Sequence, residues 1–224
     1  MKDENLSRAI KLKLCTSFVN DYKELEELSL TNKNFIGNDL NIDLKEIVEL
    51  ENLEKLSLKF FDITDEIIES INKLKKLYKL EFFMCKFKTN KHLNNNIIDL
   101  TFYCCDELQQ ETYKNNLQIK KLELTKSGVA NINDLEDFIN LKELKIRDCS
   151  IIGLPNISKL INLEYLFLNN IDLQYEFSIK KMKKLTYISL NGSKSFNNEQ
   201  YIQNLQKQNK DIQIDWRKDD LPIY

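Results

Sequence analysis

Five cysteines and one histidine are the side chains of this sequence best suited to hold a metal or attack a substrate. A structural zinc site needs cysteine pairs spaced as C-x2–4-C, but Cys104 and Cys105 are adjacent and have no histidine near them in sequence. Chemistry through a Ser–His or Cys–His pair would depend on His92 alone, which stands in the polar stretch KTNKHLNNN. We therefore predict that the protein is not an enzyme and has neither a metal site nor a cofactor.

Several of the cysteines recur at one position of a repeated pattern. The pattern L-x-x-L-x-[IL]-x-x-[CI]-x-[IL] begins at Leu141 and again at Leu163, 22 residues later. A fixed period of this length is typical of stacked-repeat proteins. The ninth position holds a small, weakly polar residue in five units: Cys85, Cys105, Ser127, Cys149 and Ser193. We expect these residues to be buried in the turn after each strand.

The first half of each unit has the pattern of a strand. Apolar and polar residues alternate from Leu144 to Arg147, which predicts a short strand with one buried face and one face in water. A single unit cannot bury its apolar face alone, so neighbouring units must stack and share one core.

The pattern resembles the leucine-rich repeat, whose unit of about 20–29 residues reads L-x-x-L-x-L-x-x-N/C-x-L. Units of 22 residues with an apolar return segment are similar to those of internalin-like proteins and of a regulatory subunit of protein phosphatase 1. The resemblance implies an α/β fold, a curved right-handed leucine-rich-repeat solenoid. Its parallel sheet would line the concave face, and helical or irregular segments would form the convex side.

The repeats predict one continuous domain. Residues 1–24 form an expected N-terminal cap, residues 25–208 hold eight repeats, and residues 209–224 form a C-terminal cap. The caps would cover the open ends of the core and its unpaired strand edges. The repeats start at Leu25, Leu53, Leu77, Ile97, Ile119, Leu141, Leu163 and Leu185.

Two return segments have apolar residues at helical spacing, and three stretches depart from the pattern. Helices are predicted over TDEIIESINKL, with Thr64 or Asp65 as its N-cap, and over NNEQYIQNLQKQN near the C-terminus. In the N-terminal cap, Leu12 and Leu14 imitate the strand pattern, and the polar stretch around His92 predicts an irregular loop. In the fourth repeat Glu107 stands where an apolar residue is expected, and we expect the next residue, Leu108, to replace it in the core.

The overall composition suits a soluble globular protein. Hydrophobic residues make up 42% and charged residues 30% of the chain, and the net charge of −2 argues against a nucleic-acid binder. Charges interrupt every apolar run of the start MKDENLSRAIKLKLC, which predicts neither a signal peptide nor a membrane span. The odd number of cysteines suits reduced thiols. We expect a cytoplasmic monomer without a membrane or nucleic-acid partner.

The outward side of the strands is the candidate binding surface. The third, fifth and seventh positions of each unit point away from the core, because the fourth and sixth point into it. Phe83 and Tyr103 share one such position in adjacent units, as do Tyr165 and Tyr187. Strands about 4.8 Å apart would bring each pair into side-chain contact. The alternative is that aromatic residues simply suit strands and stack on one another.

These positions predict the binding residues. The candidate partner-binding residues are Phe83, Tyr103, Arg147, Tyr165, Phe167 and Tyr187, and the residues expected to steer a partner electrostatically are Lys55, Lys59 and Lys79. We predict a non-enzymatic protein–protein interaction module that holds a protein partner on the concave face. The alternatives are a structural spacer or scaffold without a high-affinity partner, a regulatory subunit of a phosphatase, and a host-directed effector.

Overall fold

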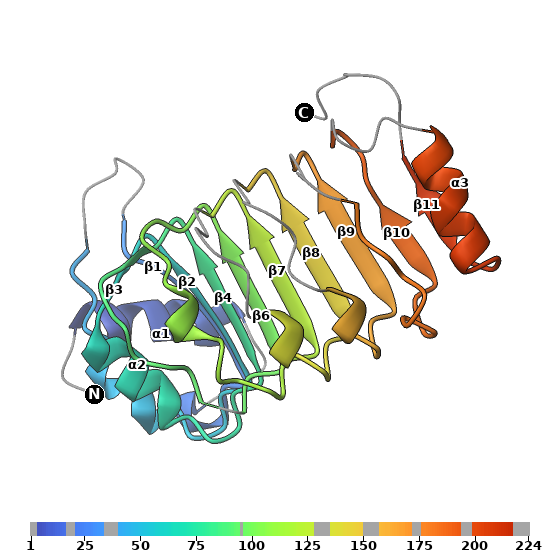
Figure 1. The fold of residues 1–224 in the computed structure, drawn as a ribbon. Coiled ribbons are helices and arrows are strands. Elements are labelled where there is room, and N and C mark those ends of the chain that lie inside the picture. The colour runs from blue at the N-terminus through green and yellow to red at the C-terminus, as the bar shows by residue number, and fades with distance from the viewer. Residues whose placement is uncertain are drawn as a thin grey trace. The chain divides into compact units, whose positions relative to one another are not determined.

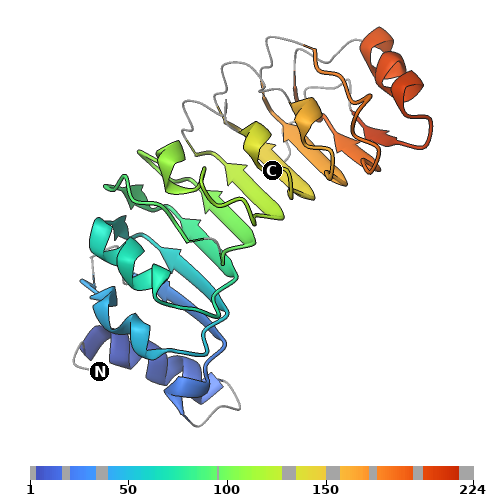
Figure 2. The same cartoon turned by 60° about the horizontal axis from the view of Figure 1, so that its bottom comes forward.

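The computed structural model describes residues 4–16, 21–33, 40–94, 96–127, 135–149, 157–171, 176–193 and 199–216. The chain forms two compact units, unit 1 (Met1–Asn116) and unit 2 (Leu117–Tyr224). Each unit is a stack of short parallel strands, whose return segments lie on one side of the strand layer (Figures 1 and 2).

Unit 1 begins with a helix and continues with four parallel strands in the order β1-β2-β4-β6. The main elements are α1 (Glu4–Thr16), β1 (Glu27–Thr31), β2 (Lys55–Lys59), α2 (Asp65–Asn72), β4 (Lys79–Phe83) and β6 (Asp99–Tyr103). A two-stranded ladder pairs β3 (Asp62–Ile63) with β5 (Lys86–Phe87). Short 3-10 helices cover Tyr22–Glu24, Leu44–Glu49 and Gln110–Thr112.

Unit 2 contains five parallel strands in the order β7-β8-β9-β10-β11. They are β7 (Lys121–Thr125), β8 (Glu143–Arg147), β9 (Tyr165–Asn169), β10 (Tyr187–Ser189) and β11 (Gln213–Asp215). The 3-10 helices Leu135–Asp137 and Ile157–Lys159 and the helix α3 (Glu199–Gln208) occupy return segments.

The core is built from the fourth and sixth positions of the strands. Leu144 lies in register with Leu122 on one side and Leu166 on the other, and its side chain is 0% exposed. In unit 1 the Phe82 and Phe102 rings at the sixth position stack with centroids 5.5 Å apart. The same positions are thus filled by the same kind of side chain in successive repeats, which confirms the predicted α/β solenoid.

The ninth-position residues form the buried ladder that the sequence predicts. Four of them donate a hydrogen bond to the sixth-position carbonyl of the preceding repeat: Cys85 Sγ to Leu58 at 3.4 Å, Cys105 Sγ to Phe82 at 3.4 Å, Cys149 Sγ to Leu124 at 3.5 Å and Ser193 Oγ to Leu168 at 2.9 Å. Burial raises the pKa of Cys85 to about 11 and that of Cys105 to about 12. These thiols therefore stay protonated and serve as small packing groups.

The eighth position has a backbone conformation that the sequence did not predict. Seven residues there have a positive φ between 49° and 74°: Phe60, Met84, Cys104, Lys126, Asp148, Asn170 and Gly192. The bend lets the backbone N–H reach the seventh-position carbonyl of the next repeat, as from Met84 to Tyr103 at 2.7 Å and from Asn170 to Asn191 at 2.9 Å. Residues other than glycine adopt this conformation at a cost of about 1–2 kcal/mol each, which the added hydrogen bonds help to offset.

Asparagines tie together the turns that precede the strands. Within unit 2, Asn140 Nδ2 donates to the carbonyl of Leu117 at 2.9 Å and Asn162 Nδ2 to that of Ile139 at 2.8 Å. The turns leave the large side chains of Leu117, Ile139 and Ile161 exposed at a 22-residue spacing. This row lies outside the strands.

The departures from the repeat have mixed outcomes. The strand-like pattern of Leu12 and Leu14 does not form a strand, because both residues lie in helix α1. The same helix buries Leu6 and Ile10. A helix needs apolar residues three or four apart, which Leu6 and Ile10 provide. The tail 217–224 of the expected C-terminal cap lies outside the described residues, and the boundaries of the caps and repeats stay predictions.

The other local predictions are confirmed. Helix α2 begins after Thr64, although its hydroxyl donates to Glu66 and makes no capping bond to the backbone. Helix α3 covers the second predicted segment, and residues 88–94 form a loop. Leu108 is buried and Glu107 is exposed. Glu107 has a positive φ of 56°, and the core position of the repeat moves from Glu107 to the next residue. None of the helices in the described part of the chain is long and apolar enough to cross a membrane.

Candidate functional site

The candidate site is the outward side of the strands, called the strand face of each unit. In unit 1 it consists of Glu27, Ser29, Thr31, Lys55, Ser57, Lys59, Lys79, Glu81, Phe83, Asp99, Thr101 and Tyr103. In unit 2 it consists of Lys121, Glu123, Thr125, Glu143, Lys145, Arg147, Tyr165, Phe167, Asn169, Tyr187, Ser189, Gln213 and Asp215. The burial of successive residues alternates along most strands, so these side chains share one side of the sheet.

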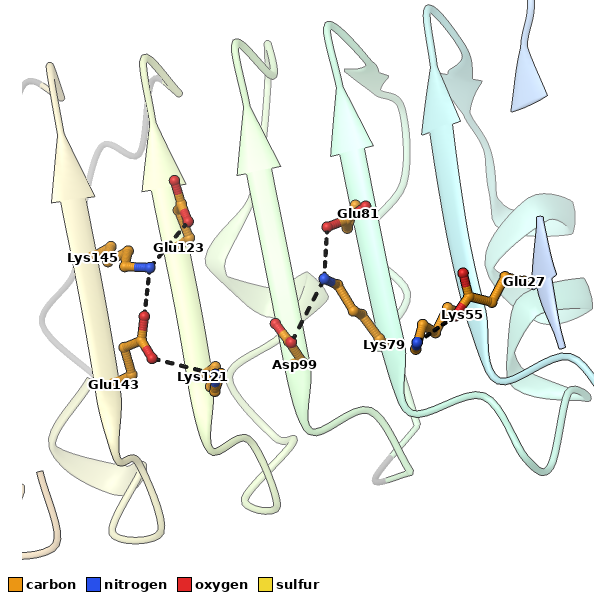
Figure 3. A network of polar contacts seen from close by, with 9 residues as sticks. All are labelled: Glu27, Lys55, Lys79, Glu81, Asp99, Lys121, Glu123, Glu143 and Lys145. Atoms are coloured by element: carbon orange, nitrogen blue, oxygen red, sulfur yellow. Dashed lines mark hydrogen bonds and ion pairs between the residues drawn. The ribbon is translucent and has the colours of Figure 1, made fainter. Parts of the chain in front are cut away.

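The lysines of the unit 1 strand face are engaged by neighbouring side chains (Figure 3). Lys79 Nζ lies 3.1 Å from Glu81 and 3.9 Å from Asp99, and Lys55 forms an ion pair with Glu27. Burial lowers the pKa of Lys79, but the hydrogen bond and charge of Glu81 outweigh this effect, and the pKa is raised. Two of the three predicted steering lysines, Lys55 and Lys79, therefore face local carboxylates that reduce their field at a distance.

Two aromatic rings lie at the end of the unit 1 strands. Phe83 and Tyr103, both at the seventh position, have ring centroids 6.0 Å apart, and Lys59 Nζ lies 5.3 Å from the Phe83 centroid. A hollow of about 380 Å³ over β1, β2 and β4 is lined partly by Phe83. Met84 follows at the eighth position and is 48% exposed. Met84 could not be predicted as part of this face from the sequence, because the exposure of its side chain depends on its positive φ.

The lysines of the unit 2 strand face form a connected set of ion pairs (Figure 3). Lys145 Nζ lies 2.5 Å from Glu143 and 4.0 Å from Glu123, and Lys121 Nζ lies 3.4 Å from Glu143. Burial raises the pKa of Glu143, but the two lysines outweigh it and the pKa is lowered. The Glu143 carboxylate is thus held ionised between two lysines.

The aromatic residues of unit 2 pair differently from the prediction. Tyr165 and Tyr187 lie in register on adjacent strands, but among the described residues the ring that contacts Tyr187 is that of Phe167, at 5.3 Å. Tyr165 is 43% exposed. The diagonal contact is favoured because a ring reaches a side chain two residues along the neighbouring strand. The outcome is a pair of tilted rings in contact, beside an exposed tyrosine.

Phe167 also lies under two cations. Lys145 Nζ is 5.2 Å and Arg147 Cζ is 5.9 Å from the centroid of its ring. Tyr187 donates a hydrogen bond from its hydroxyl to Asp215 at 3.4 Å, and its pKa is raised by burial and by the charge of Asp215. The structure thus brings Arg147, Tyr165, Phe167 and Tyr187 together on three adjacent strands, β8, β9 and β10.

Two outward positions of unit 2 are buried, contrary to expectation. Thr125 and Ser189 are only 6% and 3% exposed. Ser189 donates to Asn169 at 2.8 Å, and Asn191 donates to Asp215 at 2.9 Å. The burial of these two residues and the hydrogen bonds around Ser189 could not be predicted from single positions in the sequence.

The other residues that could take part in chemistry lie apart from one another. The exposed ring of His92 lies beside the Glu111 carbonyl and 3.3 Å from Asn115. Among the residues that the structure describes, no three His, Cys, Asp or Glu side chains are grouped to hold a metal. Cys104 is half-buried at an eighth position.

The geometry is that of a leucine-rich-repeat solenoid. No family model matches the sequence, and neither does any curated protein. Internalin C2 of Listeria monocytogenes has a similar structure, with a TM-score of 0.64 and 20% identity over 96% of this chain and 93% of that one. A leucine-rich-repeat protein of Leptospira interrogans has a TM-score of 0.58 and 18% identity over 99% of this chain and 59% of the other. InlP of Listeria monocytogenes has a TM-score of 0.51 and 15% identity over 84% and 64%. These similarities show the fold.

Proposed function

We propose that the protein is a non-enzymatic interaction module that binds a protein partner on its strand faces. The observation that carries the proposal is the exposed aromatic group of unit 2, where Tyr165 is 43% exposed beside the Phe167–Tyr187 pair. Interface energy is concentrated in Tyr, Trp and Arg residues near the centre of a contact. The Phe83–Tyr103 pair and exposed Met84 supply a second candidate patch in unit 1.

The proposed binding surface includes residues of both units. The binding residues are Phe83, Tyr103, Arg147, Tyr165, Phe167 and Tyr187, and Lys55, Lys59 and Lys79 assist the encounter. The module acts as a cytoplasmic monomer and has no nucleic-acid or membrane partner. Roles as a phosphatase regulatory subunit or as a host-directed effector are narrower forms of this proposal, and the identity of the partner decides between them.

The second candidate is a structural spacer. It is favoured by the ring contacts of Phe83 with Tyr103 and of Phe167 with Tyr187, since rings that cover part of one another have less need of a partner. The spacer offers no explanation for the exposure of Tyr165.

A comparative pull-down tests the proposal. The wild-type chain, a Tyr165→Ala/Tyr187→Ala double variant and an Ile161→Ala control are used as baits in native lysate. Ile161 is 51% exposed but lies outside the strands, so its loss controls for the removal of exposed apolar surface. The proposal expects a protein captured by the wild type and the control and depleted with the double variant. Equal recovery on all three baits would mean that the partner binds away from Tyr165 and Tyr187, and no captured protein would favour the spacer.

A further inference from the structure

Arg147 is a cation of the unit 2 strand face that has no carboxylate partner among the described residues. Lys121 and Lys145 share Glu143, and Lys145 also lies beside Glu123. The other carboxylate of this face, Asp215, accepts from Tyr187 and Asn191 on β10 and the turn after it. The three carboxylates of this strand face are therefore already engaged by other side chains.

The neighbours of Arg147 in the sheet are neutral. Thr125 and Asn169 are its register partners on β7 and β9. The side-chain oxygen of Asn169 already accepts a hydrogen bond from Ser189. Arg147 Nε is buried without a hydrogen-bond partner, and no described group accepts from the rest of the guanidinium. A buried donor without an acceptor is costly. The side chain is only half-buried, so an acceptor supplied from outside the chain can reach the remaining N–H groups of the guanidinium.

Phe167 holds the guanidinium in place for such an acceptor. Arg147 Cζ lies 5.9 Å from the ring centroid, and a guanidinium on an aromatic ring keeps the donors at its edge free to bind a carboxylate with two parallel hydrogen bonds. Stacking also limits the rotamer entropy that binding would remove. The lysines and glutamates beside Arg147 balance in charge, so its positive charge is uncompensated locally and complements an acidic group.

We propose that Arg147 binds the side-chain carboxylate of an Asp or Glu residue in the partner, next to an apolar partner residue that packs on Tyr165, Phe167 and Tyr187. This inference rests on the proposed function and names the chemistry of the partner segment. Tyr165 is the first residue of β9 and Arg147 the last residue of β8, so the recognised segment crosses the sheet obliquely.

Peptide selection followed by a double-mutant cycle tests this inference. Short random peptides displayed on phage are selected on the full 224-residue chain, and the best binder that loses affinity for Tyr165→Ala is synthesised. Its affinity is measured by fluorescence anisotropy for the wild type, Arg147→Gln and Arg147→Lys. Each acidic residue of the peptide is then replaced by its amide. Lys180→Gln, at an exposed lysine outside the strands, is the matched control for the lost positive charge, and thermal unfolding checks that every variant is folded.

We expect that at one acidic position of the peptide the amide form binds the wild type roughly tenfold or more weakly than the acidic form does. The two forms should bind Arg147→Gln with equal affinity, because the carboxylate has lost its partner there. Arg147→Lys should recover only part of the affinity, because lysine lacks the planar fork. Peptides that need Tyr165 but have no acidic residue coupled to Arg147 would overturn the inference and leave the proposed function standing. A terminal carboxylate coupled to Arg147 in place of a side chain would overturn it too. If no selected peptide depends on Tyr165 or Tyr187, both this inference and the proposed function fail.

Discussion

The strand faces of the two units carry their aromatic residues at opposite ends of the strands. In unit 1, Phe83 and Tyr103 occupy the seventh position, directly before the positive-φ residues Met84 and Cys104. In unit 2, Tyr165 and Tyr187 occupy the third position and Phe167 the fifth. The core positions are filled alike in both units, so outward positions can vary without disturbing the fold.

The charges differ between the two faces as well. In unit 1 the lysines lie beside carboxylates or, for Lys59, beside the Phe83 ring. In unit 2 the lysines are paired in the same way, but Arg147 has no carboxylate among the described residues. A lysine-rich sequence therefore need not produce a strongly positive surface, whereas one arginine without a carboxylate partner can determine the charge of a patch.

The largest expected effect is the protection of the ladder thiols, which are alike in both units. A pKa of about 11 for Cys85 and about 12 for Cys105, against 9.0 for a free thiol, lowers the thiolate fraction at pH 8 by about 100-fold or more. Alkylation of the native protein at pH 8, followed by mass spectrometry, should label Cys104 and spare Cys85, Cys105 and Cys149. Because the pKa values are raised, labelling of the native ladder should increase only as the pH approaches them.

Full labelling of all five cysteines in denaturant is the control for the reagent. Rapid native labelling of Cys85 or Cys105 would mean that the ladder is open to solvent, in conflict with their burial.

Removal of a core leucine should destabilise either unit to a similar extent. Leu80→Ala in unit 1 and Leu144→Ala in unit 2 each remove a fully buried side chain, which costs about 2–5 kcal/mol. Lys145→Ala changes an outward residue next to Leu144 and should cost less than about 1 kcal/mol. Denaturant unfolding monitored by circular dichroism measures all three. Equal effects at positions 144 and 145 would show that the strand register is wrong.

Aromatic substitutions on the two faces should separate their roles in binding. Tyr165→Ala and Tyr187→Ala are each expected to weaken partner binding by about 1–3 kcal/mol without unfolding the protein. Phe83→Ala, made as a single substitution in the wild-type chain, shows whether the aromatic patch at the strand ends of unit 1 contributes as much to the binding free energy. Isothermal titration gives the affinities. Loss of affinity with Phe83→Ala alone would move the main binding surface to unit 1.

Glycine at the eighth position should stabilise the protein slightly. Met84→Gly in unit 1 and Lys126→Gly in unit 2 relieve a positive φ of 51° and 49°, with a net gain of up to about 1 kcal/mol after the entropy that glycine loses on folding. Unfolding free energies measure the gain, and Lys121→Gly, within strand β7, is the control that should destabilise. A clear loss of stability for Met84→Gly would contradict the positive φ.

Charge reversal on unit 1 should have the smallest effect. Lys55→Glu and Lys59→Glu are expected to slow association a few-fold at low salt and to leave dissociation nearly unchanged. The effect is small because Lys55 already faces Glu27. Stopped-flow association rates at two salt concentrations test it, and a change in dissociation alone would show that these lysines contact the partner directly.

Repeat register and buried positions could be predicted from the sequence because each buried position imposes its own residue type. Leu144 and Cys149 are examples, since an apolar residue and a small residue recur there in other units. The two helical return segments could be predicted because their buried positions carry apolar residues at helical spacing. Helix α1 was not, because Leu12 and Leu14 satisfy a strand pattern while Leu6 and Ile10 satisfy a helical one.

The candidate site was only partly predictable. The direction of each outward side chain follows from the alternation along the strand, so Tyr165 and Arg147 were placed on the correct face. The contacts of outward side chains depend on rotamers and on neighbouring repeats, which is why the contact of the Tyr187 ring with Phe167 and that of Lys79 with Glu81 were not predicted. Met84 was missed because no residue type marks the positive φ of the eighth position.

Hydroxyl-radical footprinting of the partner complex tests most directly whether the strand face is the binding surface. Oxidation of Tyr165 is compared in the free and bound protein with that of Met84 and of the exposed row Leu117, Ile139 and Ile161 outside the strands. Binding on the unit 2 strand face predicts that Tyr165 becomes protected while this row keeps its reactivity. Continued oxidation of Tyr165, with protection of Leu117, Ile139 and Ile161 instead, would contradict it.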